Sequence, residues 1–206
     1  MKKVLKTVFL IIVTLGLTTS CVNDDDFVIP TVYDYLFNQS FSDIPVGSGS
    51  NEVAIALDGW VNVNLQNTGK LWHGRSFNSN NHAEFSSYYS NTGTNDKAWL
   101  ITPKLNLTNS SGEILSFTTK YRYSNGDVLK VYISTDFDGS EANISTANWI
   151  ELEITLPTTD DEVTNSGAID LSSYESDNVR IAFVYTGSKA GITTTCQLDN
   201  IKISKN

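Results

Sequence analysis

Residues 114–135, "ILSFTTKYRYSNGDVLKVYIST", carry the strongest indication of how this chain folds. Both halves are rich in β-branched and aromatic residues, which are enriched in strands. In the second half Leu129, Val131 and Ile133 occupy every other position, so a strand would place them on one face. Asn125-Gly126 stands between the halves and is a strong hairpin signal. The stretch therefore predicts two strands that pair as a hairpin.

Two later segments show the same alternation. "WIELEITL" (149–156) places four aliphatic residues on one face, from Ile150 to Leu156, and "VRIAFVYT" (179–186) places Ile181, Phe183 and Tyr185 together. The segments between them are rich in Asn, Ser, Gly and Thr. Many short strands with polar turns predict an all-β fold, a two-sheet antiparallel jelly-roll sandwich. We expect it to span residues 33–206 as one domain.

The first twenty residues differ from the rest of the chain. Three lysines precede an apolar run over residues 8–17, which is shorter than the roughly 20 residues that a spanning helix needs. This order is typical of a secretory signal peptide, so residues 1–20 are excluded from the fold. Cys21 follows Ser20 directly, as the lipidated cysteine follows the lipobox of a bacterial lipoprotein, although Thr18 stands where leucine is usual. We expect Cys21 to be lipidated and to anchor the protein to a membrane.

Residues 21–32 then form an acidic tether. Asp24, Asp25 and Asp26 follow the cysteine and resemble the export signal of surface lipoproteins in Bacteroidota-type cells. The alternative is an ordinary solvated acidic linker. The signal predicts an outer-membrane protein that faces the cell exterior.

The charge of the chain is strongly negative. It has 14 Lys and Arg against 23 Asp and Glu, a formal charge of −9. The leader holds three of the lysines and no acid, so the exported part is more acidic still. Such a surface repels phosphate backbones, and nucleic acid is therefore excluded as an expected partner.

Several sequence blocks occur in a recognisable order. They are "AWLITPKLNL" (98–107), "SGAIDLSSY" (166–174), "VRIAFVYTG" (179–187) and "LDNIKIS" (198–204). Together they resemble the choice-of-anchor J class of extracellular modules, akin to cleaved-adhesin and MAM-like jelly rolls. The resemblance implies a β jelly roll without enzymatic activity. It also implies that Asp199 helps to hold a structural calcium ion; the alternative is that Asp199 bonds to backbone or solvent. In cleaved-adhesin modules the loop that corresponds to residues 61–71 is acidic, but here it has no carboxylate, which argues against a calcium site in that loop.

Residues that could carry chemistry are few. His73 and His82 are the only histidines, too few for a typical zinc site, and no nucleophile-elbow motif is present. Asp136 and Asp138 in "DFDGS" lack the rest of a calcium loop, and "DDE" at 160–162 is expected to be an exposed acidic loop. Two carboxylates distant in sequence could still form a glycosidase pair, so a hydrolase stays as a third alternative.

The aromatic residues offer a binding surface, because aromatic faces can stack on sugars. We expect Trp99 and Trp149 to fill the core or seal sheet edges, and Cys196 to be a small buried thiol. The candidates for an exposed platform, with burial as the alternative for each, are Trp72, Tyr88, Tyr89, Tyr121 and Tyr123.

Taken together, the sequence predicts a cell-surface lipoprotein with a non-catalytic, adhesin-like or carbohydrate-binding domain, whose partner is a glycan or a surface protein. The alternative is a structural or accessory spacer subunit of an outer-membrane complex with no ligand of its own.

Overall fold

The computed structural model describes residues 35–67 and 69–205, so the predicted signal peptide, Cys21 and residues 24–26 lie outside the described part. The strands are β1 (Tyr35–Gln39), β2 (Val53–Ala54), β3 (Val61–Asn64), β4 (His73–Phe77), β5 (Asn80–Phe85), β6 (Asn95–Ile101), β7 (Ile114–Arg122), β8 (Leu129–Ser134), β9 (Ile150–Leu152), β10 (Thr164–Asn165), β11 (Ile169–Asp170), β12 (Arg180–Ser188) and β13 (Thr195–Ser204). Two single-turn 3-10 helices, η2 (Ser87–Tyr89) and η3 (Glu141–Asn143), interrupt them.

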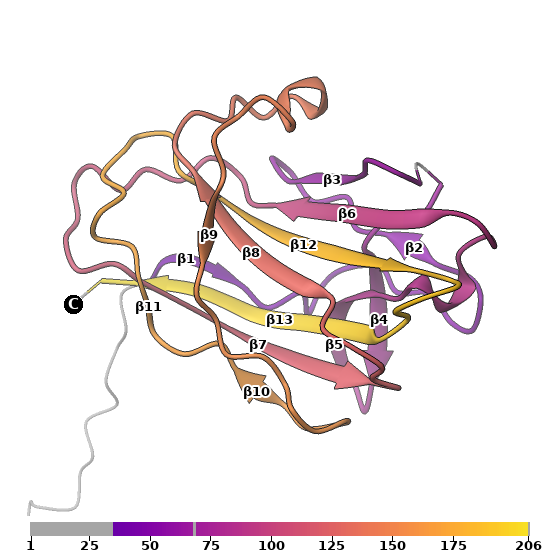
Figure 1. The fold of residues 1–206 in the computed structure, drawn as a ribbon. Helices are drawn as coiled ribbons and strands as arrows, with labels where there is room; N and C mark the ends of the chain where they lie inside the picture. The colour runs from indigo at the N-terminus through magenta and orange to yellow at the C-terminus, as the bar shows by residue number, and fades with distance from the viewer. Residues whose placement is uncertain (1–34, 68, 206) are drawn as a thin grey trace, which may run out of the picture. The chain divides into compact units, whose positions relative to one another are not determined.

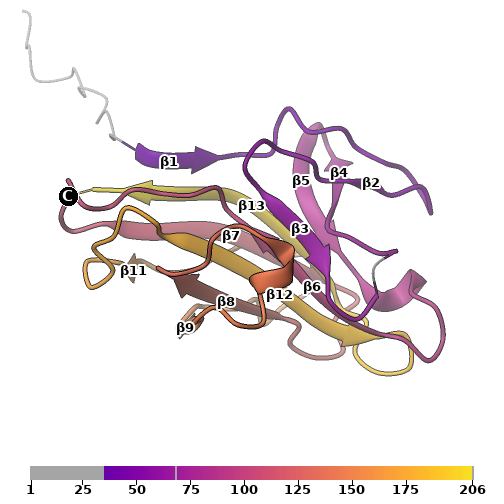
Figure 2. The ribbon, with the colours of Figure 1, turned by 90° about the horizontal axis from the view of Figure 1, so that it is seen from above.

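The strands form two antiparallel sheets that pack face to face, as predicted (Figure 1). The larger sheet has eight strands in the order β10-β7-β13-β5-β4-β2, with β1 added to β13 and β11 to β7. The smaller sheet has five strands in the order β3-β6-β12-β8-β9. Figure 2 shows β1, the first described strand, beside β13, the last. The predicted all-β sandwich is confirmed.

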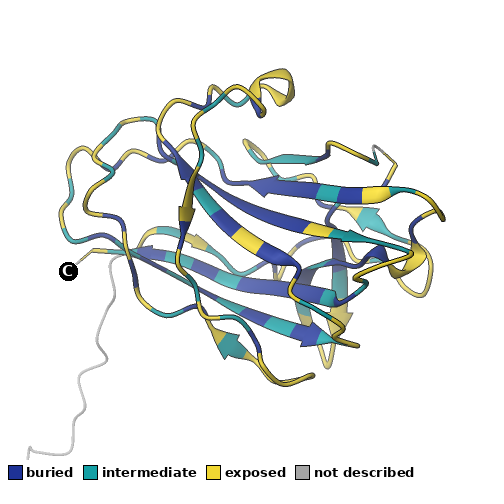
Figure 3. Ribbon diagram, viewed as in Figure 1, coloured by how far each residue is buried: buried dark blue, intermediate teal, exposed yellow. Residues whose placement is uncertain are grey.

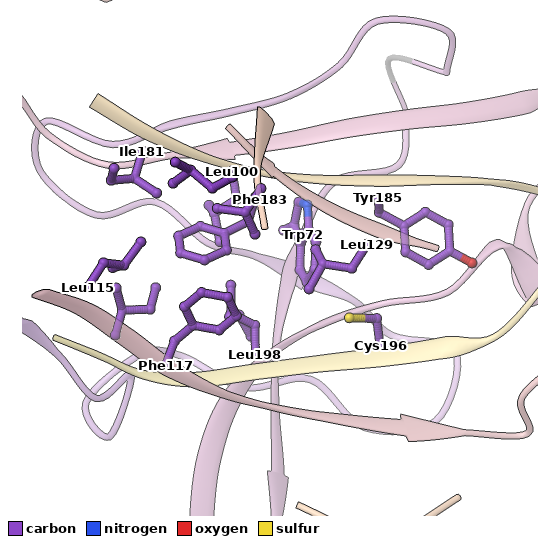
Figure 4. Packing of buried hydrophobic residues seen from close by; sticks show 14 of the residues in the cluster. Trp72, Leu100, Leu115, Phe117, Leu129, Ile181, Phe183, Tyr185, Cys196 and Leu198 are labelled. Carbon is purple, nitrogen blue, oxygen red and sulfur yellow. The ribbon is translucent and has the colours of Figure 1, made fainter. Parts of the chain in front are cut away.

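The core lies between the sheets, and along β7 buried residues alternate with partly exposed ones (Figure 3). On β12, Ile181, Phe183 and Tyr185 are fully buried, as their spacing predicts. Figure 4 shows Phe117 of the larger sheet facing Phe183 of the smaller one, and their ring centroids lie 5.1 Å apart in an edge-to-face arrangement. Such pairs add about 0.5–1.5 kcal/mol beyond the area that they bury.

A second apolar cluster covers the outer face of the smaller sheet. Trp99 of β6 stacks on Tyr132 of β8, with ring centroids 5.9 Å apart, and contacts Trp149 at 5.2 Å. Phe137, from the loop after β8, packs against Trp149 and is fully buried. The prediction that Trp99 and Trp149 serve packing is confirmed.

The predicted hairpin over residues 114–135 is wrong. β7 pairs with β13 in the larger sheet, whereas β8 pairs with β12 in the smaller one. Asn125 instead holds the crossing chain to the loop before β13: its Oδ1 accepts hydrogen bonds from the backbone N–H groups of Thr193 (2.9 Å) and Thr194 (3.2 Å). The apolar faces of β7 and β8 therefore meet across the core, rather than side by side in one sheet.

The strand predicted over residues 149–156 is also shorter than expected. β9 ends at Leu152, and Ile150 is 44% exposed although it lies on the same side of the strand as the buried Leu152, because β9 is the edge strand of the smaller sheet. Beyond β9 the chain crosses toward the larger sheet, where the N–H of Thr155 donates to the carbonyl of Ser166. Within the described residues, no helix has the length and apolar character needed to cross a membrane.

Candidate functional site

The outer face of the larger sheet carries a groove made of three overlapping hollows of about 420, 370 and 180 Å³. We call it the sheet groove. The first and second hollows share the residues Arg75, Glu84, Tyr89, Tyr123 and Thr195. The second and third share Phe77, His82 and Gln197. The hollows therefore follow one another across β4, β5, β13 and β7.

The same alternation that builds the core creates the floor of the sheet groove. On β13, Cys196 and Leu198 point into the core and are fully buried, so Thr195 and Gln197 face outward. On the neighbouring β5, Ala83 and Phe85 point inward, which leaves polar residues on the outer side. The buried thiol predicted for Cys196 is confirmed.

Glu84 lies at the centre of this floor. Its carboxylate accepts hydrogen bonds from Nε of Arg75 (3.3 Å) and from Nε2 of Gln197 (3.0 Å). The Nε2 atoms of His73 and His82 each lie 3.7 Å from one of its two oxygens. Both histidines are almost fully buried, and their Nε2 atoms make no hydrogen bond within the described residues. The floor is thus a polar network, built from three adjacent strands.

This environment sets the ionisation of Glu84. Burial alone acts to raise the pKa of its carboxyl group, because the charged form loses water. Interactions with His73, His82 and Gln197 favour the charged form and outweigh burial, so the pKa of Glu84 lies well below its ordinary value. Glu84 is therefore a carboxylate at neutral pH.

Exposed aromatic side chains stand around the groove. Tyr88 is 56% exposed, Tyr89 60%, Tyr123 74% and Phe77 53%. The rings of Tyr88 and Tyr89 form an edge-to-face pair with centroids 4.9 Å apart. Tyr123 leaves the sheet just after β7 with a positive φ of 52°, which turns its ring toward solvent. Amphipathic rings of this kind suit ligands with both apolar and hydroxyl-bearing surfaces.

A buried network fixes the turn that carries Tyr88 and Tyr89. The hydroxyl groups of Ser87 and Ser90 both donate to Oδ2 of Asp96 at 2.6 Å. The N–H of Ser87 donates to the hydroxyl oxygen of Tyr185 (3.1 Å), and that hydroxyl donates to the carbonyl of Thr194 (2.9 Å). The two rim tyrosines thus stand on a turn that is tied to the core.

Two of the five residues that the sequence offered as candidates for an exposed aromatic platform are buried. Trp72 is fully buried, and its Nε1–H donates to the carbonyl of Ala98 (3.2 Å). Tyr121 is 1% exposed, because it shares the inward face of β7 with Phe117, and its hydroxyl accepts a hydrogen bond from the N–H of Leu129 (3.4 Å). Tyr88, Tyr89 and Tyr123 are exposed and are brought together at the first hollow.

Asp199 is 8% exposed, and donors already occupy its carboxylate: Nδ2 of Asn80 (3.0 Å) and the N–H of Asn200 (2.7 Å). Burial raises its pKa. The described residues contain no cluster of three His, Cys, Asp or Glu that could hold a metal. A calcium ion held by Asp199 stays a prediction, because the part of the chain that follows the predicted signal peptide, where the resemblance puts the rest of that site, lies outside the described residues.

The other acidic candidates make local contacts. Asp136 accepts from the hydroxyl of Ser134 (2.7 Å), and Asp138 from the N–H of Ser140 (2.8 Å). In the exposed acidic loop, Asp161 pairs with Arg122 at 2.7 Å. These contacts are those of solvated turns and surface ion pairs.

The sequence reasoning missed the floor residues Arg75, Glu84, Gln197 and the aromatic Phe77. A signal was present in "NHAEF" (81–85), where His82 and Glu84 alternate with Ala83 and Phe85, which point into the core. An alternating pattern predicts that the polar face of a strand points away from the core, but it does not indicate that a groove lies on that face.

Comparison with solved structures supports the fold. The K1 cleaved adhesin domain of Lys-gingipain from Porphyromonas gingivalis W83 aligns with a TM-score of 0.51 and 17% identity, covering 82% of this chain and 98% of that domain. The K3 domain of the same protein aligns with a TM-score of 0.51 and 18% identity, covering 85% and 100%. No curated protein matches the sequence. Residues 70–205 match the family described as Domain of unknown function (DUF5017), and the chain belongs to that family.

Proposed function

We propose that this domain is a non-catalytic binding module whose sheet groove holds a glycan. The observation that carries the proposal is the groove itself, with a polar floor around Glu84 and a rim of exposed tyrosines. Binding sites combine apolar and aromatic surface with a few well-placed polar groups that fix orientation. A sugar ring presents C–H groups to an aromatic face and hydroxyl groups to polar side chains, so it matches both parts of the groove.

The overlapping hollows favour a chain of sugars over a single ring. The groove crosses four strands, and neighbouring strands lie about 4.8 Å apart, so it extends over roughly 14 Å. The likeness in fold to adhesin domains agrees with a binding role.

We further propose that the protein is a lipoprotein anchored through Cys21 and displayed on the cell exterior. The support is the order of signal peptide, cysteine and Asp24, Asp25 and Asp26 in the sequence. Protease added to intact cells should then cleave the protein. Protection in intact cells, with cleavage after the outer membrane is opened, would show instead that it faces the periplasm.

A spacer subunit without a ligand is the second candidate. The burial of Trp72 and Trp99 favours it, because these large rings are used for packing rather than for contact with a partner. The hollowed face with its exposed tyrosines favours binding, and we therefore place the glycan module first.

The two candidates are separated by a glycan array and calorimetry with purified residues 22–206. The glycan module should bind at least one oligosaccharide, and the double variant Tyr89→Ala, Tyr123→Ala should weaken that binding by roughly tenfold or more, which is a loss of about 1.4 kcal/mol or more of binding free energy. Ile150→Ala, exposed on the other sheet, is the matched control and should bind normally. A folded protein that binds nothing across the array would support the spacer.

A further inference from the structure

The charged side chains that line the sheet groove cancel one another. The cations are Arg75, Lys120 and Arg122, and the carboxylates are Glu52, Glu84 and Asp199. We propose that the groove selects electrically neutral glycans over glycans that carry carboxylate groups. This inference rests on the proposed glycan-binding function and narrows it to one class of ligand.

The two arginines that line the groove already donate hydrogen bonds to acceptors of the protein itself. Arg75 donates to Glu84 through Nε (3.3 Å) and to the carbonyl of Gly49 through Nη2 (2.6 Å). Arg122 donates to Asp161 through Nε (2.7 Å). Arg75 also donates to the carbonyl of Asn51 through Nη1 (3.3 Å), so an acidic sugar that approached Arg75 would have to displace one of its acceptors, because bidentate recognition of a carboxylate needs two free donors of one guanidinium.

The carboxylates of the floor would also repel an anion. Glu84 is held as a carboxylate by its neighbours, and Glu52 pairs with Lys70 at 2.6 Å while its other oxygen lies 3.8 Å from Nδ1 of His73. Both carboxylates line the first hollow, beside the exposed tyrosines. A ligand carboxylate placed there meets two like charges, whereas a neutral hydroxyl can donate a hydrogen bond to either.

The aromatic rim adds to the same preference. The face of an aromatic ring carries the negative end of its quadrupole, so it attracts C–H groups and cations and disfavours anions. The cations near the rim already occupy such faces: Lys189 lies 4.5 Å from the ring centroid of Tyr88, and Lys120 lies 5.3 Å from that of Phe77. The formal charge of −9 on the whole chain opposes the approach of a polyanion as well.

The test uses matched ligands that differ only in charge. A neutral polysaccharide that binds residues 22–206 is compared by calorimetry with the same polysaccharide oxidised at C6 to its uronate. We expect the uronate form to bind at least tenfold more weakly. We also expect the affinity for the neutral form to change by less than about twofold between roughly 0.05 and 0.5 M NaCl, because no ion pair is formed.

A pair of variants tests whether the groove charges cause the preference. Glu52→Gln removes one negative charge from the first hollow and should reduce the ratio of neutral to uronate affinity. Glu151→Gln removes a charge of the same kind from β9 of the other sheet and should leave the ratio unchanged.

Two results would overturn the inference in different ways. If the uronate form binds as tightly as the neutral form or more tightly, with an affinity that falls as salt increases, the groove is an acidic-glycan site and only the inference fails. If neither neutral nor acidic glycans bind the folded protein, the proposed function fails and the inference fails with it.

Discussion

Gln197 of β13 donates a hydrogen bond from Nε2 to Oε2 of Glu84 on β5, over 3.0 Å. The two residues are direct partners in the register of adjacent strands, so the bond joins the polar floor of the sheet groove to the framework of the larger sheet. Arg75 of β4 donates to the other oxygen, which extends the link to a third strand. The floor of the sheet groove therefore helps to hold the strands of the larger sheet together, and its hydrogen bonds can be tested by measuring the free energy of unfolding.

We expect Glu84→Gln to lower the free energy of unfolding by about 1–3 kcal/mol, because the change removes the charge that Arg75 requires and replaces one of the two acceptor oxygens by an NH2 group that faces a donor. Urea denaturation measures the loss. Glu151→Gln is the control, since Glu151 pairs with Lys130 on the surface, and it should change the stability by less than about 0.5 kcal/mol. Equal effects of the two variants would contradict a special role for Glu84.

The same carboxylate should make stability depend on acid pH. The pKa of Glu84 in the folded protein lies below its ordinary value of 4.5, so the charged form stabilises the fold above that pH, and this contribution is lost as the pH falls toward the folded pKa. The difference in unfolding free energy between the wild type and Glu84→Gln should therefore shrink as the pH decreases below about 4.5. Urea titrations at several pH values measure it; a constant difference down to pH 3 would show that Glu84 does not titrate as proposed.

The sequence predicts which face of a strand is buried much better than it predicts which strands pair with one another. The alternation at Ile181, Phe183 and Tyr185 indicates a buried face, and all three residues are fully buried. It carries no information about which strand lies beside them, because pairing in a sandwich depends on segments far apart in the chain. This is why β7 and β8 looked like a hairpin, although each pairs within a different sheet.

The candidate site likewise contains residues that the sequence could indicate and residues that it could not. Tyr123, a platform candidate with burial as its alternative, is exposed, because its positive φ turns it out of the strand. Tyr121, two positions earlier, has the same residue type but stays in register with Phe117 and is buried. The floor around Glu84 could not be predicted, since it forms only when β4 and β5, which follow one another in the chain, are placed beside β13 from the far end of the sequence.

Asn125 lies in the segment that connects β7 of the larger sheet to β8 of the smaller one, and its hydrogen bonds can be tested by mutation. Asn125 accepts hydrogen bonds from the N–H groups of Thr193 and Thr194 and donates to the carbonyl of Gly191 through Nδ2 (3.1 Å). We expect Asn125→Ala to cost about 1–3 kcal/mol, because it leaves these backbone groups unpaired at the point where the chain passes between sheets. Asn91→Ala is the matched control and should be close to neutral, because Asn91 lies in an exposed turn and accepts the hydrogen bonds from Thr94 through its backbone carbonyl. Thermal and urea denaturation would show a small effect for both variants if the crossing were held by packing alone.

Tyr185 links the core to the rim of the sheet groove, and its hydroxyl offers the most direct test of that link. Burial raises the pKa of Tyr185 to about 12, so the hydroxyl stays protonated and keeps donating to Thr194 while it accepts from Ser87. Tyr185→Phe keeps the ring against Phe85, whose centroid lies 4.5 Å away, but removes both hydrogen bonds.

We expect Tyr185→Phe to lower stability by about 1–3 kcal/mol, as for other buried groups left without a partner. We also expect it to weaken glycan binding several-fold, since the turn that carries Tyr88 and Tyr89 loses its tie to the core. Calorimetry at a temperature where the variant is fully folded separates the two effects. Tyr132→Phe, on the outer face of the smaller sheet, is the control for binding. Reduced stability with unchanged affinity would mean that Tyr185 supports the fold but does not position the rim.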